Sequence, residues 1–392
     1  MACEPLTMKR KFPAILLAVV ALSAIAGCSS SEDTKQQVSL DDTRLNQIQL
    51  VGTHNSYHMA MPAALFAAEK GAIAGMGDAA KGLGNPDSLN YGHKRLTDQL
   101  NAGIRTFELD VWADSKGGLF SKPLAPGFLK VDGIAPPQGL DQPGFKVLHI
   151  VDIDYFSTCP TLVSCLSEIR TWSDAHPNHL PIVIMLELKD EPLPKPINIT
   201  RVEKIGAPEM DRLDAEIRSV LSPQRMIVPD DVRGSADTLQ QAVTTNGWPT
   251  LRESRGKLMF FMDNAGAYRT DYLQGHDSLA GRVLFTSAGE GQADAAVLKE
   301  NDPADGAKIK SLVEAGYFVR TRADDDPATI GADSTAQRDI ALTSGAQVVS
   351  TDYPVNEPHS SGYVAKIGDQ LQARCNPVAV TDRCVAGELE RP

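Results

Sequence analysis

Eight short apolar runs recur along the sequence and constrain the fold more than any other feature. They are rich in Val, Ile, Leu and Phe, and most lack the alternation of apolar and polar residues that marks a half-exposed strand. We therefore interpret them as buried strands of a parallel sheet covered on both faces. The runs span residues 47–52, 104–110, 145–151, 181–188, 257–262, 282–286, 317–322 and 346–351.

Segments with helical spacing of apolar residues separate these runs, at 95–102, 162–175, 209–221 and 304–315. Strand and helix thus alternate, and eight such units fit a (β/α)8 TIM-type barrel, a fold that needs roughly 250 residues or more. No repeat or linker divides the chain. Residues 45–392 are therefore expected to form a single domain, with a C-terminal tail beyond residue 354.

Long insertions follow three of the expected strands, at residues 59–92, 113–144 and 189–208. The first is rich in Ala and Gly, the second in Gly and Pro, and the third in Pro. In a barrel all three would border the carboxyl ends of the strands, which is the face that carries active sites.

The N-terminal segment has the pattern of an export signal. Three basic residues precede an apolar stretch at 12–26 that is short for a membrane span, and small residues then lead to Cys28. This pattern resembles a bacterial lipobox, which implies a signal peptide at residues 1–27, lipid attachment at Cys28 and a polar tether at residues 28–44. We expect an exported protein of the bacterial cell envelope, anchored by lipid on the periplasmic or outer surface. The alternative is an ordinary secretory signal.

The chain is acidic, with 38 Lys and Arg against 50 Asp and Glu and a net charge of −12. Removal of residues 1–27 would leave 35 basic and 49 acidic residues, a net charge of −14. Such a surface repels phosphate backbones, which excludes nucleic acid as an expected partner. It also provides no basic patch for anionic lipid, so membrane contact is expected through the N-terminal anchor alone.

Four cysteines remain when the two in the N-terminal segment are set aside. Cys159 and Cys165 are six positions apart, and Cys375 and Cys384 are nine apart. Because export exposes the chain to oxidants, these spacings predict two local disulfides, the second of which would staple the C-terminal tail. Free buried thiols are the alternative.

Reactive side chains gather at or near the ends of the first four apolar runs. In a strand, residues two apart point the same way, so Glu108 and Asp110 project together. Two such carboxylates repel each other unless a cation lies between them. Together with Glu187 and the amide oxygen of Asn55 they form an oxygen ligand set that suits Ca²⁺ or Mg²⁺.

Two histidines, His54 and His149, are left free for proton transfer because a hard cation does not require imidazole. A single strand histidine is more often a hydrogen-bonded structural group, and Glu108 alone could pair with Arg105 or Lys189. The functional interpretation depends on the position of all six side chains at one end of the first four strands.

Four ordered motifs resemble the calcium-dependent phosphatidylinositol-specific phospholipases C, in particular a bacterial branch. They are residues 53–57 (THNSY), 107–110 (FELD), 147–149 (VLH) and 185–188 (MLEL), within a similarity that spans about residues 45–354. The resemblance implies a PLC-like phosphodiesterase barrel. By position it implies that the calcium ligands are Asn55, Glu108, Asp110 and Glu187 and that the catalytic histidines are His54 and His149.

The resemblance also implies a reaction on phosphatidylinositol-type lipids. Calcium would activate the inositol 2-hydroxyl, which attacks phosphorus and releases diacylglycerol and a cyclic inositol phosphate, with or without later hydrolysis of the ring. His149 is expected to protonate the leaving oxygen. His54 is expected to stabilise the phosphate and to take the hydroxyl proton, with Glu108 and Glu187 as alternative bases.

Four further side chains are candidates for contacts with the head group: Lys189, Arg320, Arg322 and Tyr353. Arginine is the better bidentate phosphate ligand, and Tyr353 could stack on the inositol ring. Salt bridges between the arginines and the acidic run at residues 324–326 are the structural alternative. Asp263 is expected to have a structural role, and the remaining histidines, from His58 to His359, are expected at the surface.

Two other functions remain open. A glycerophosphodiester or lysophospholipid phosphodiesterase could use the same barrel, although such enzymes usually follow the first histidine with Arg-Gly, where this chain has Asn55 and Ser56. A non-catalytic surface lipoprotein stabilised by calcium would need neither His54 nor His149.

Overall fold

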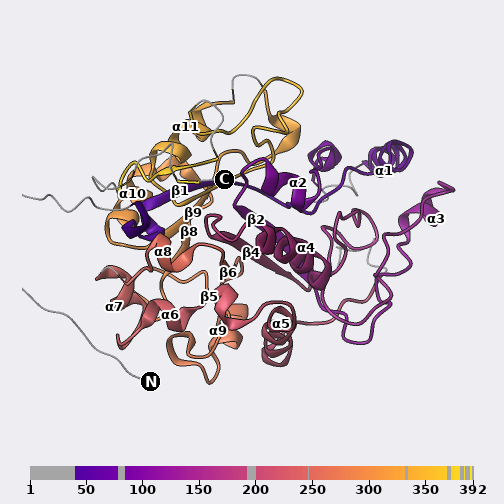
Figure 1. Cartoon of the computed structure of the whole chain (residues 1–392). Helices are drawn as coiled ribbons and strands as arrows, with labels where there is room; N and C mark the ends of the chain where they lie inside the picture. The colour runs from indigo at the N-terminus through magenta and orange to yellow at the C-terminus, as the bar shows by residue number, and fades with distance from the viewer. Residues whose placement is uncertain are drawn as a thin grey trace, which may run out of the picture. The chain divides into compact units, whose positions relative to one another are not determined.

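Parallel strands with helices between them form the centre of the structure (Figure 1), a computed structural model. The chain divides into residues 1–37 and 38–392. The structure describes residues 40–77, 84–191, 200–245, 247–331, 334–368, 372–379, 384 and 389–390. The predicted signal peptide, the lipidation site at Cys28 and most of the tether lie outside these ranges.

The central parallel strands form two hydrogen-bonded groups. The first group contains β2 (Thr106–Trp112), β4 (Ile182–Lys189), β6 (Leu258–Met262) and β7 (Leu284–Phe285), with the short β5 (Met226–Ile227) also on β6. The second group contains β8 (Val297–Lys299), β9 (Phe318–Arg322), β10 (Val348–Thr351) and β1 (Ile48–Thr53). A parallel bridge between Ser287 and Val297 connects β7 to β8. The strands therefore follow one another in chain order, as the (β/α)8 fold predicts.

The first and second strands approach each other without forming a ladder. Within the described residues, β1 and β2 are linked by the Ser56 amide, which donates to the Glu108 carbonyl at 3.0 Å. A Cβ atom on Gly52 would lie 1.4 Å from the Thr106 Oγ1 atom. Only glycine therefore permits this approach, which places the turn after β1 directly over the active end of β2.

The four helices expected from apolar spacing are present. They are α2 (Leu96–Asn101), α4 (Leu162–Ala175), α5 (Ala207–Val220) and α10 (Gly306–Glu314). Helix α4 begins at Thr161, whose hydroxyl accepts a hydrogen bond from the Ser164 amide at 3.1 Å, and it buries Leu166, Ile169 and most of Trp172 against the barrel. Shorter helices α6 (Pro229–Arg233), α7 (Leu239–Thr244), α8 (Leu251–Ser254), α9 (Ala267–Leu273) and α11 (Ala336–Thr343) complete the shell.

The prediction of a parallel strand at residues 145–151 is wrong. Only β3 (Lys146–Val147) is extended there, and it pairs antiparallel with β2, with Val147 opposite Val111. The run is apolar because Leu148 and Val151 pack into a second hydrophobic cluster beside the barrel. The strand that takes its place in the barrel, β8, has three residues and was missed because so short a segment leaves no periodic pattern.

The first two insertions fold into a layer at the active end of the barrel. Helices α1 (Ala63–Gly75) and α3 (Ala125–Leu129) lie beside each other, away from the central strands (Figure 1). The second cluster lies beneath them and includes Leu65, Trp112 and Tyr155. Trp112 also donates a hydrogen bond to the Leu148 carbonyl at 2.9 Å, which fixes the loop that carries His149.

Glu69 on α1 is buried in this layer, at 6% exposure, and its Oε1 atom has no hydrogen-bond partner within the described residues. Burial, and then the nearby Asp154 carboxylate, raises the pKa of Glu69 to about 8. The carboxyl of the unfolded chain ionises near pH 4.3, so stability should fall as pH rises from there to about 8.

Glu69→Gln should therefore stabilise the protein by about 2–4 kcal/mol at pH 8.5, with the advantage shrinking toward pH 4.5. Urea denaturation of both proteins at the two pH values measures this difference. An equal effect at both values would show that the carboxyl is ionised throughout.

The C-terminal segment is more than a tail. Strand β11 (Ala373–Cys375) pairs antiparallel with β1, with Cys375 opposite Ile48. Both predicted disulfides, Cys159–Cys165 and Cys375–Cys384, are present. Among the helices described, none is long and apolar enough to cross a membrane.

Candidate active site

Three carboxylates converge where the central strands end. Glu108 and Asp110 come from β2, and Glu187 comes from β4, where it pairs in register with Asp110. One oxygen of each lies within 4.8 Å of the other two, close enough to share a metal ion. Asp110 is fully buried, and neither of its oxygens accepts a hydrogen bond from the described residues.

The electrostatics of Asp110 show that this cluster lacks sufficient positive charge. Burial raises its pKa well above the usual value, and Glu187 and Glu108 raise it further, against the opposing effect of Lys189. The Lys189 ammonium lies 2.6 Å from Glu187 Oε1 and 3.3 Å from Asp110 Oδ2. One ammonium is therefore shared between two carboxylates, and the cluster keeps an excess of negative charge.

Asn55 adds a further unpartnered oxygen. It lies in the turn after β1 with a positive φ of 44°, which asparagine tolerates better than most residues. Its Nδ2 donates to the Tyr91 hydroxyl at 2.8 Å, while its buried Oδ1 has no hydrogen-bond partner in the part of the chain that is described. Tyr91 is close enough to Asp110 for that carboxylate to raise the tyrosine pKa, after the larger effect of burial.

The donor set fits a hard divalent cation. It consists of three carboxylates and one amide, all oxygen ligands, and the Asp110 and Asn55 oxygens have no other hydrogen-bond partner among the described residues. Unpaired buried oxygens are costly, so a bound cation would compensate them.

His54 bridges this cluster and a carboxylate that sequence reasoning missed. Its Nδ1 lies 2.8 Å from Asp352 Oδ1, at the end of β10, and its Nε2 lies 3.6 Å from Glu108 Oε1. Burial, followed by the charges of Arg322 and Arg320, lowers the pKa of His54 well below its usual value despite the opposing effect of Glu108. Asp352 follows a strand end as Asn55 does, so the same sequence rule would have found it.

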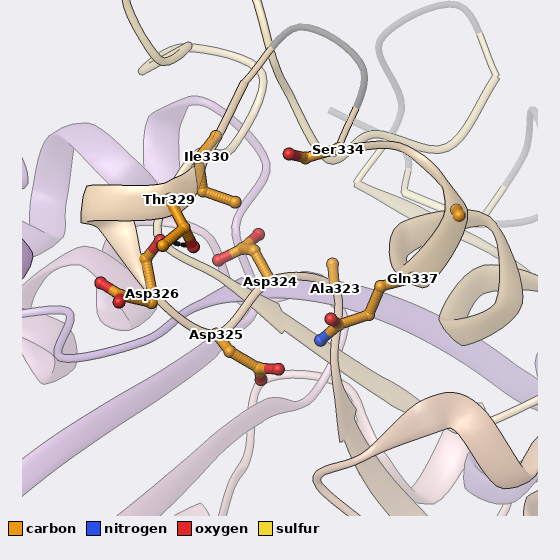
Figure 2. A pocket seen from close by; sticks show the side chains of 9 residues that line it. Ala323, Asp324, Asp325, Asp326, Thr329, Ile330, Ser334 and Gln337 are labelled. Atoms are coloured by element: carbon orange, nitrogen blue, oxygen red, sulfur yellow. Dashed lines mark hydrogen bonds between the residues drawn. The ribbon is translucent and has the colours of Figure 1, made fainter.

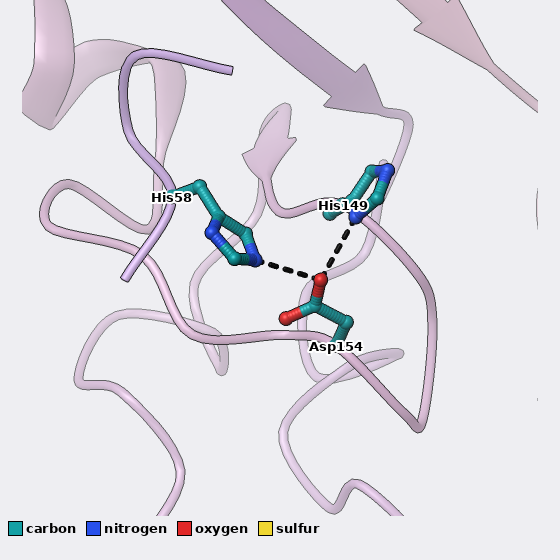
Figure 3. Close-up of side chains that lie close together, drawn as sticks. All are labelled: His58, His149 and Asp154. Atoms are coloured by element: carbon teal, nitrogen blue, oxygen red, sulfur yellow. Dashed lines mark hydrogen bonds and ion pairs between the residues drawn. The ribbon is translucent and has the colours of Figure 1, made fainter. Parts of the chain in front are cut away.

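His149 lies in a loop and not on a strand. The chain turns tightly between Ile150 and Asp154, with Asp152 at a positive φ of 67°, and this turn brings Asp154 back against His149. His149 Nδ1 lies 2.8 Å from Asp154 Oδ2, and His58 Nε2 lies 2.7 Å from the same oxygen (Figure 3). His149 was expected on a strand and was assigned no partner. The structure places it in a loop and beside Asp154.

Asp154 accepts from both histidines and stays ionised. Burial alone would raise its pKa, but His58 and His149 outweigh burial and hold the pKa at about 2. These three groups are also near enough to hold a metal ion. Both ring nitrogens, however, point to one carboxylate oxygen, which is the arrangement of two N–H donors that share an acceptor.

The expectation that the remaining histidines lie at the surface is wrong for three of them. His58 is completely buried, and His93 and His179 are 7% and 3% exposed. His93 Nε2 contacts the His54 carbonyl at 2.9 Å, and its Nδ1 contacts Glu357 at 2.6 Å. His93 therefore holds the backbone of the turn after β1.

The predicted head-group residues differ in their surroundings. Arg320 is 2% exposed and binds Glu108 Oε2 at 2.7 Å, whereas Arg322 is 3.6 Å from Asp352 Oδ2. Tyr353 is 7% exposed and packs edge-on against His359, with ring centroids 4.8 Å apart. Asp263, which was expected to have a structural role, pairs with Lys299 at 2.7 Å.

An acidic pocket lies beyond Asp352, next to the site. Its volume is about 270 Å³, and residues 324–326, Thr329, Ser334 and Gln337 border it (Figure 2). Burial, and then the Asp352 charge, raises the pKa of Asp324 to about 6. Asp324 accepts from the Asp352 amide at 2.9 Å and from the Thr351 hydroxyl. Its contacts therefore support the backbone that carries Asp352.

The fold and the site together define a barrel protein with a carboxylate cluster that could hold a metal ion at the ends of its strands. The family model described as "Phosphoinositide phospholipase C, Ca2+-dependent" matches residues 43–377. The chain therefore belongs to the calcium-dependent phosphoinositide phospholipase C family. It is a phosphoric diester hydrolase with calcium as its cofactor.

Two solved structures of a bacterial phospholipase C agree on the fold, and a third is similar over most of its length. A calcium-dependent phosphoinositol-specific phospholipase C from a Gram-negative Pseudomonas species, in its apo form, has a TM-score of 0.52 and 16% identity, covering 86% of this chain and 96% of that one. The myo-inositol complex has a TM-score of 0.51 with the same identity and coverage. A calcium-dependent phosphatidylinositol-specific enzyme from Streptomyces antibioticus has a TM-score of 0.49, 20% identity and coverage of 79% and 95%. No curated protein sequence matches the chain.

Proposed function

We propose that the protein cleaves phosphatidylinositol-type lipids at the phosphodiester bond next to diacylglycerol, by attack of the inositol 2-hydroxyl on phosphorus. One observation supports this more than any other. His54 and His149 each direct Nδ1 to a buried carboxylate, Asp352 and Asp154, which leaves Nε2 of each ring for proton exchange. The Nε2 atom of His54 lies 3.6 Å from Glu108 Oε1, in the carboxylate cluster. In-line displacement at phosphorus needs such a pair, with one group accepting and one donating a proton.

The expected calcium ligands are Asn55, Glu108, Asp110 and Glu187. When bound, calcium would supply positive charge that lowers the pKa of the attacking hydroxyl and offsets the charge that develops on phosphorus. The support for this ligand set is that Asn55 Oδ1 and both Asp110 oxygens are buried without a hydrogen bond from the described residues. Among these residues, Asp110 also shares its one ion-pair partner, Lys189, with Glu187.

His54 is assigned as the base. Because burial and two arginines lower its pKa, its imidazole is neutral near pH 7 and can accept the proton of the 2-hydroxyl at Nε2. The alternative bases are less suitable, since Glu108 is bound to Arg320 and Glu187 to Lys189. Either glutamate would first have to release its cationic partner.

His149 is assigned as the acid. The Asp154 carboxylate accepts from Nδ1 and orients the ring, so Nε2 is the atom placed to donate a proton to the glycerol oxygen as the phosphorus–oxygen bond breaks. The new bond between the inositol oxygen and phosphorus gives a cyclic inositol phosphate. With the two histidines in exchanged roles, water can open that ring.

We assign the head-group contacts to Lys189, Arg322, Arg320 and Tyr353 with different functions. Arg322 is partly exposed, and its ion pair with Asp352 is long, at 3.6 Å. It is therefore more available to a phosphate than Arg320 is. Arg320 is committed to Glu108 and acts through it. Tyr353 is largely buried against His359 and would offer an edge, not a face, to the ring.

Phosphorus NMR of phosphatidylinositol vesicles tests the proposal. We expect a cyclic phosphate signal with calcium, little with magnesium and none with EDTA. Turnover of glycerophosphoinositol or a lysophospholipid in place of the intact lipid would identify a different phosphodiesterase. Calcium-dependent thermal stability without turnover of any of these would identify a non-catalytic binding protein.

We also propose that the protein is exported and anchored by lipid at Cys28. Two disulfides support an oxidising compartment. Mass spectrometry of the mature N-terminus tests the anchor, since an unmodified cysteine or cleavage elsewhere would contradict it.

A further inference from the structure

A buried aromatic pair, His58 and Tyr91, connects the two halves of the site. His58 is completely buried and Tyr91 is 8% exposed. Their rings stack with centroids 4.3 Å apart at an angle of 20°. Each ring then makes one polar contact on its outer side: His58 with Asp154 at 2.7 Å, and Tyr91 with Asn55 at 2.8 Å.

On one side of this pair lies the expected metal ligand. The Asn55 amide can present either its oxygen or its nitrogen to the cation, and in this structure its nitrogen is held by the Tyr91 hydroxyl. By accepting from Nδ2 it leaves Oδ1 free, and this oxygen has no hydrogen-bond partner among the described residues. A flipped amide would present two N–H donors to a cation, which cannot ligate it.

On the other side lies the expected general acid. His58 Nε2 and His149 Nδ1 both lie within hydrogen-bonding distance of Asp154 Oδ2, and their rings meet edge to face at 5.7 Å. His58 thus holds the carboxylate in the orientation that selects the His149 tautomer with a proton on Nδ1. That tautomer leaves Nε2 for the substrate.

The backbone joins these contacts into one unit. The His58 amide donates to the Asn55 carbonyl at 2.8 Å within a single turn, and His58 forms an antiparallel bridge with Ser157, three residues after Asp154. His58 is therefore fixed both to the metal-ligand turn and to the loop of the general acid.

We infer that His58 and Tyr91 are positioning residues that set the orientation of Asn55 for calcium and of the Asp154–His149 pair for proton transfer. This inference rests on the proposed roles of Asn55 and His149. The two residues do not touch the substrate or the reacting atoms in this arrangement. They act through the side chains that they hold.

Tyr91→Phe removes one hydroxyl and keeps the ring. We expect the dissociation constant for calcium, measured by calorimetry, to rise about tenfold, as for one lost orienting hydrogen bond. At saturating calcium, turnover of phosphatidylinositol should recover to within about threefold of wild type. Tyr317→Phe is the matched control, since Tyr317 is also buried and its hydroxyl accepts one hydrogen bond, from the Gly291 amide at 3.2 Å. The control should bind calcium as wild type does.

Two substitutions of His58 separate its ring from its hydrogen bond. His58→Gln keeps a donor for Asp154 but loses the stack on Tyr91, and should raise the calcium dissociation constant about threefold with little change in the His149 tautomer. His58→Phe keeps the stack but loses the donor. It should shift the His149 tautomer, read from imidazole nitrogen NMR shifts, and lower turnover about tenfold at unchanged calcium affinity.

The results distinguish this inference from the proposed function. Calorimetry and NMR need no substrate, so both measurements test the inference even when the protein is inactive. A wild-type protein that binds calcium without cleaving the lipid would refute the proposed function alone. The inference is overturned if Tyr91→Phe binds calcium as wild type does, if His58→Phe leaves the tautomer unchanged, or if the wild type binds no calcium.

Discussion

Replacing His149 with alanine should lower the turnover of phosphatidylinositol by about 10²-fold or more, with calcium binding unchanged. The loss follows from the assigned role, because the diacylglycerol oxygen is a poor leaving group unless it is protonated as it departs. Initial rates at saturating calcium measure the effect. His276→Ala is the control, since His276 contacts the Ala280 carbonyl and belongs to a loop after α9.

The same variant should recover when the leaving group needs no proton. An inositol phosphate ester of p-nitrophenol departs as a stable phenolate, so His149→Ala should cleave it within about tenfold of the wild-type rate. His54→Ala should lose activity on both substrates, since the attacking hydroxyl is common to them. Equal losses by His149→Ala on lipid and on the nitrophenyl ester would contradict the assignment of His149 as the acid.

Asp154 offers an independent check on the same step. Asp154→Asn keeps the size of the side chain but can donate to His149 Nδ1, which favours the opposite tautomer. A loss of about 10²-fold on the lipid is expected, with the same recovery on the nitrophenyl ester.

Most of the candidate site could be predicted from the sequence because its residues follow a simple rule. Asn55, Glu108, Asp110 and Glu187 lie at the ends of apolar runs, and parallel strands bring such ends to one edge of a barrel. The disulfides were predicted from the cysteine spacing and the expected export. Strand β8 could not be predicted, because three residues are too few to show a periodic pattern of apolar residues.

What the sequence did not reveal are contacts that depend on loops. Asp154 reaches His149 through a five-residue turn with a positive φ at Asp152, and no local pattern predicts the direction of that turn. His58 was expected at the surface because a lone histidine without a motif usually is exposed. Its burial results from Tyr91, in the insertion at residues 59–92, and from Asp154, in the turn at residues 150–154.

Asp110→Asn should weaken calcium binding by about 10²-fold or more, and Lys189→Met should strengthen it by about tenfold. The two side chains have opposite effects on the charge of the cluster, because Asp110 is a buried ligand whereas the Lys189 ammonium lies between Asp110 and Glu187 and competes with the cation. Calorimetry measures both affinities. Asp325→Asn is the control for net charge, since that carboxylate is largely exposed beside Arg322.

Without calcium, the two substitutions should also have opposite effects on thermal stability, with Lys189→Met now the weaker variant. In EDTA, Lys189→Met should melt below wild type because the buried carboxylates lose their cation. Asp110→Asn should melt at or above wild type because it removes a carboxyl buried beside Glu187 and Glu108. Calcium should then raise the melting temperature of Lys189→Met by more than it raises that of wild type. It should raise the melting temperature of Asp110→Asn only a little. If both variants bound calcium as wild type does, the carboxylate cluster would not be the calcium site. If both bound it more weakly, Lys189 would support the ligands instead of competing with the cation.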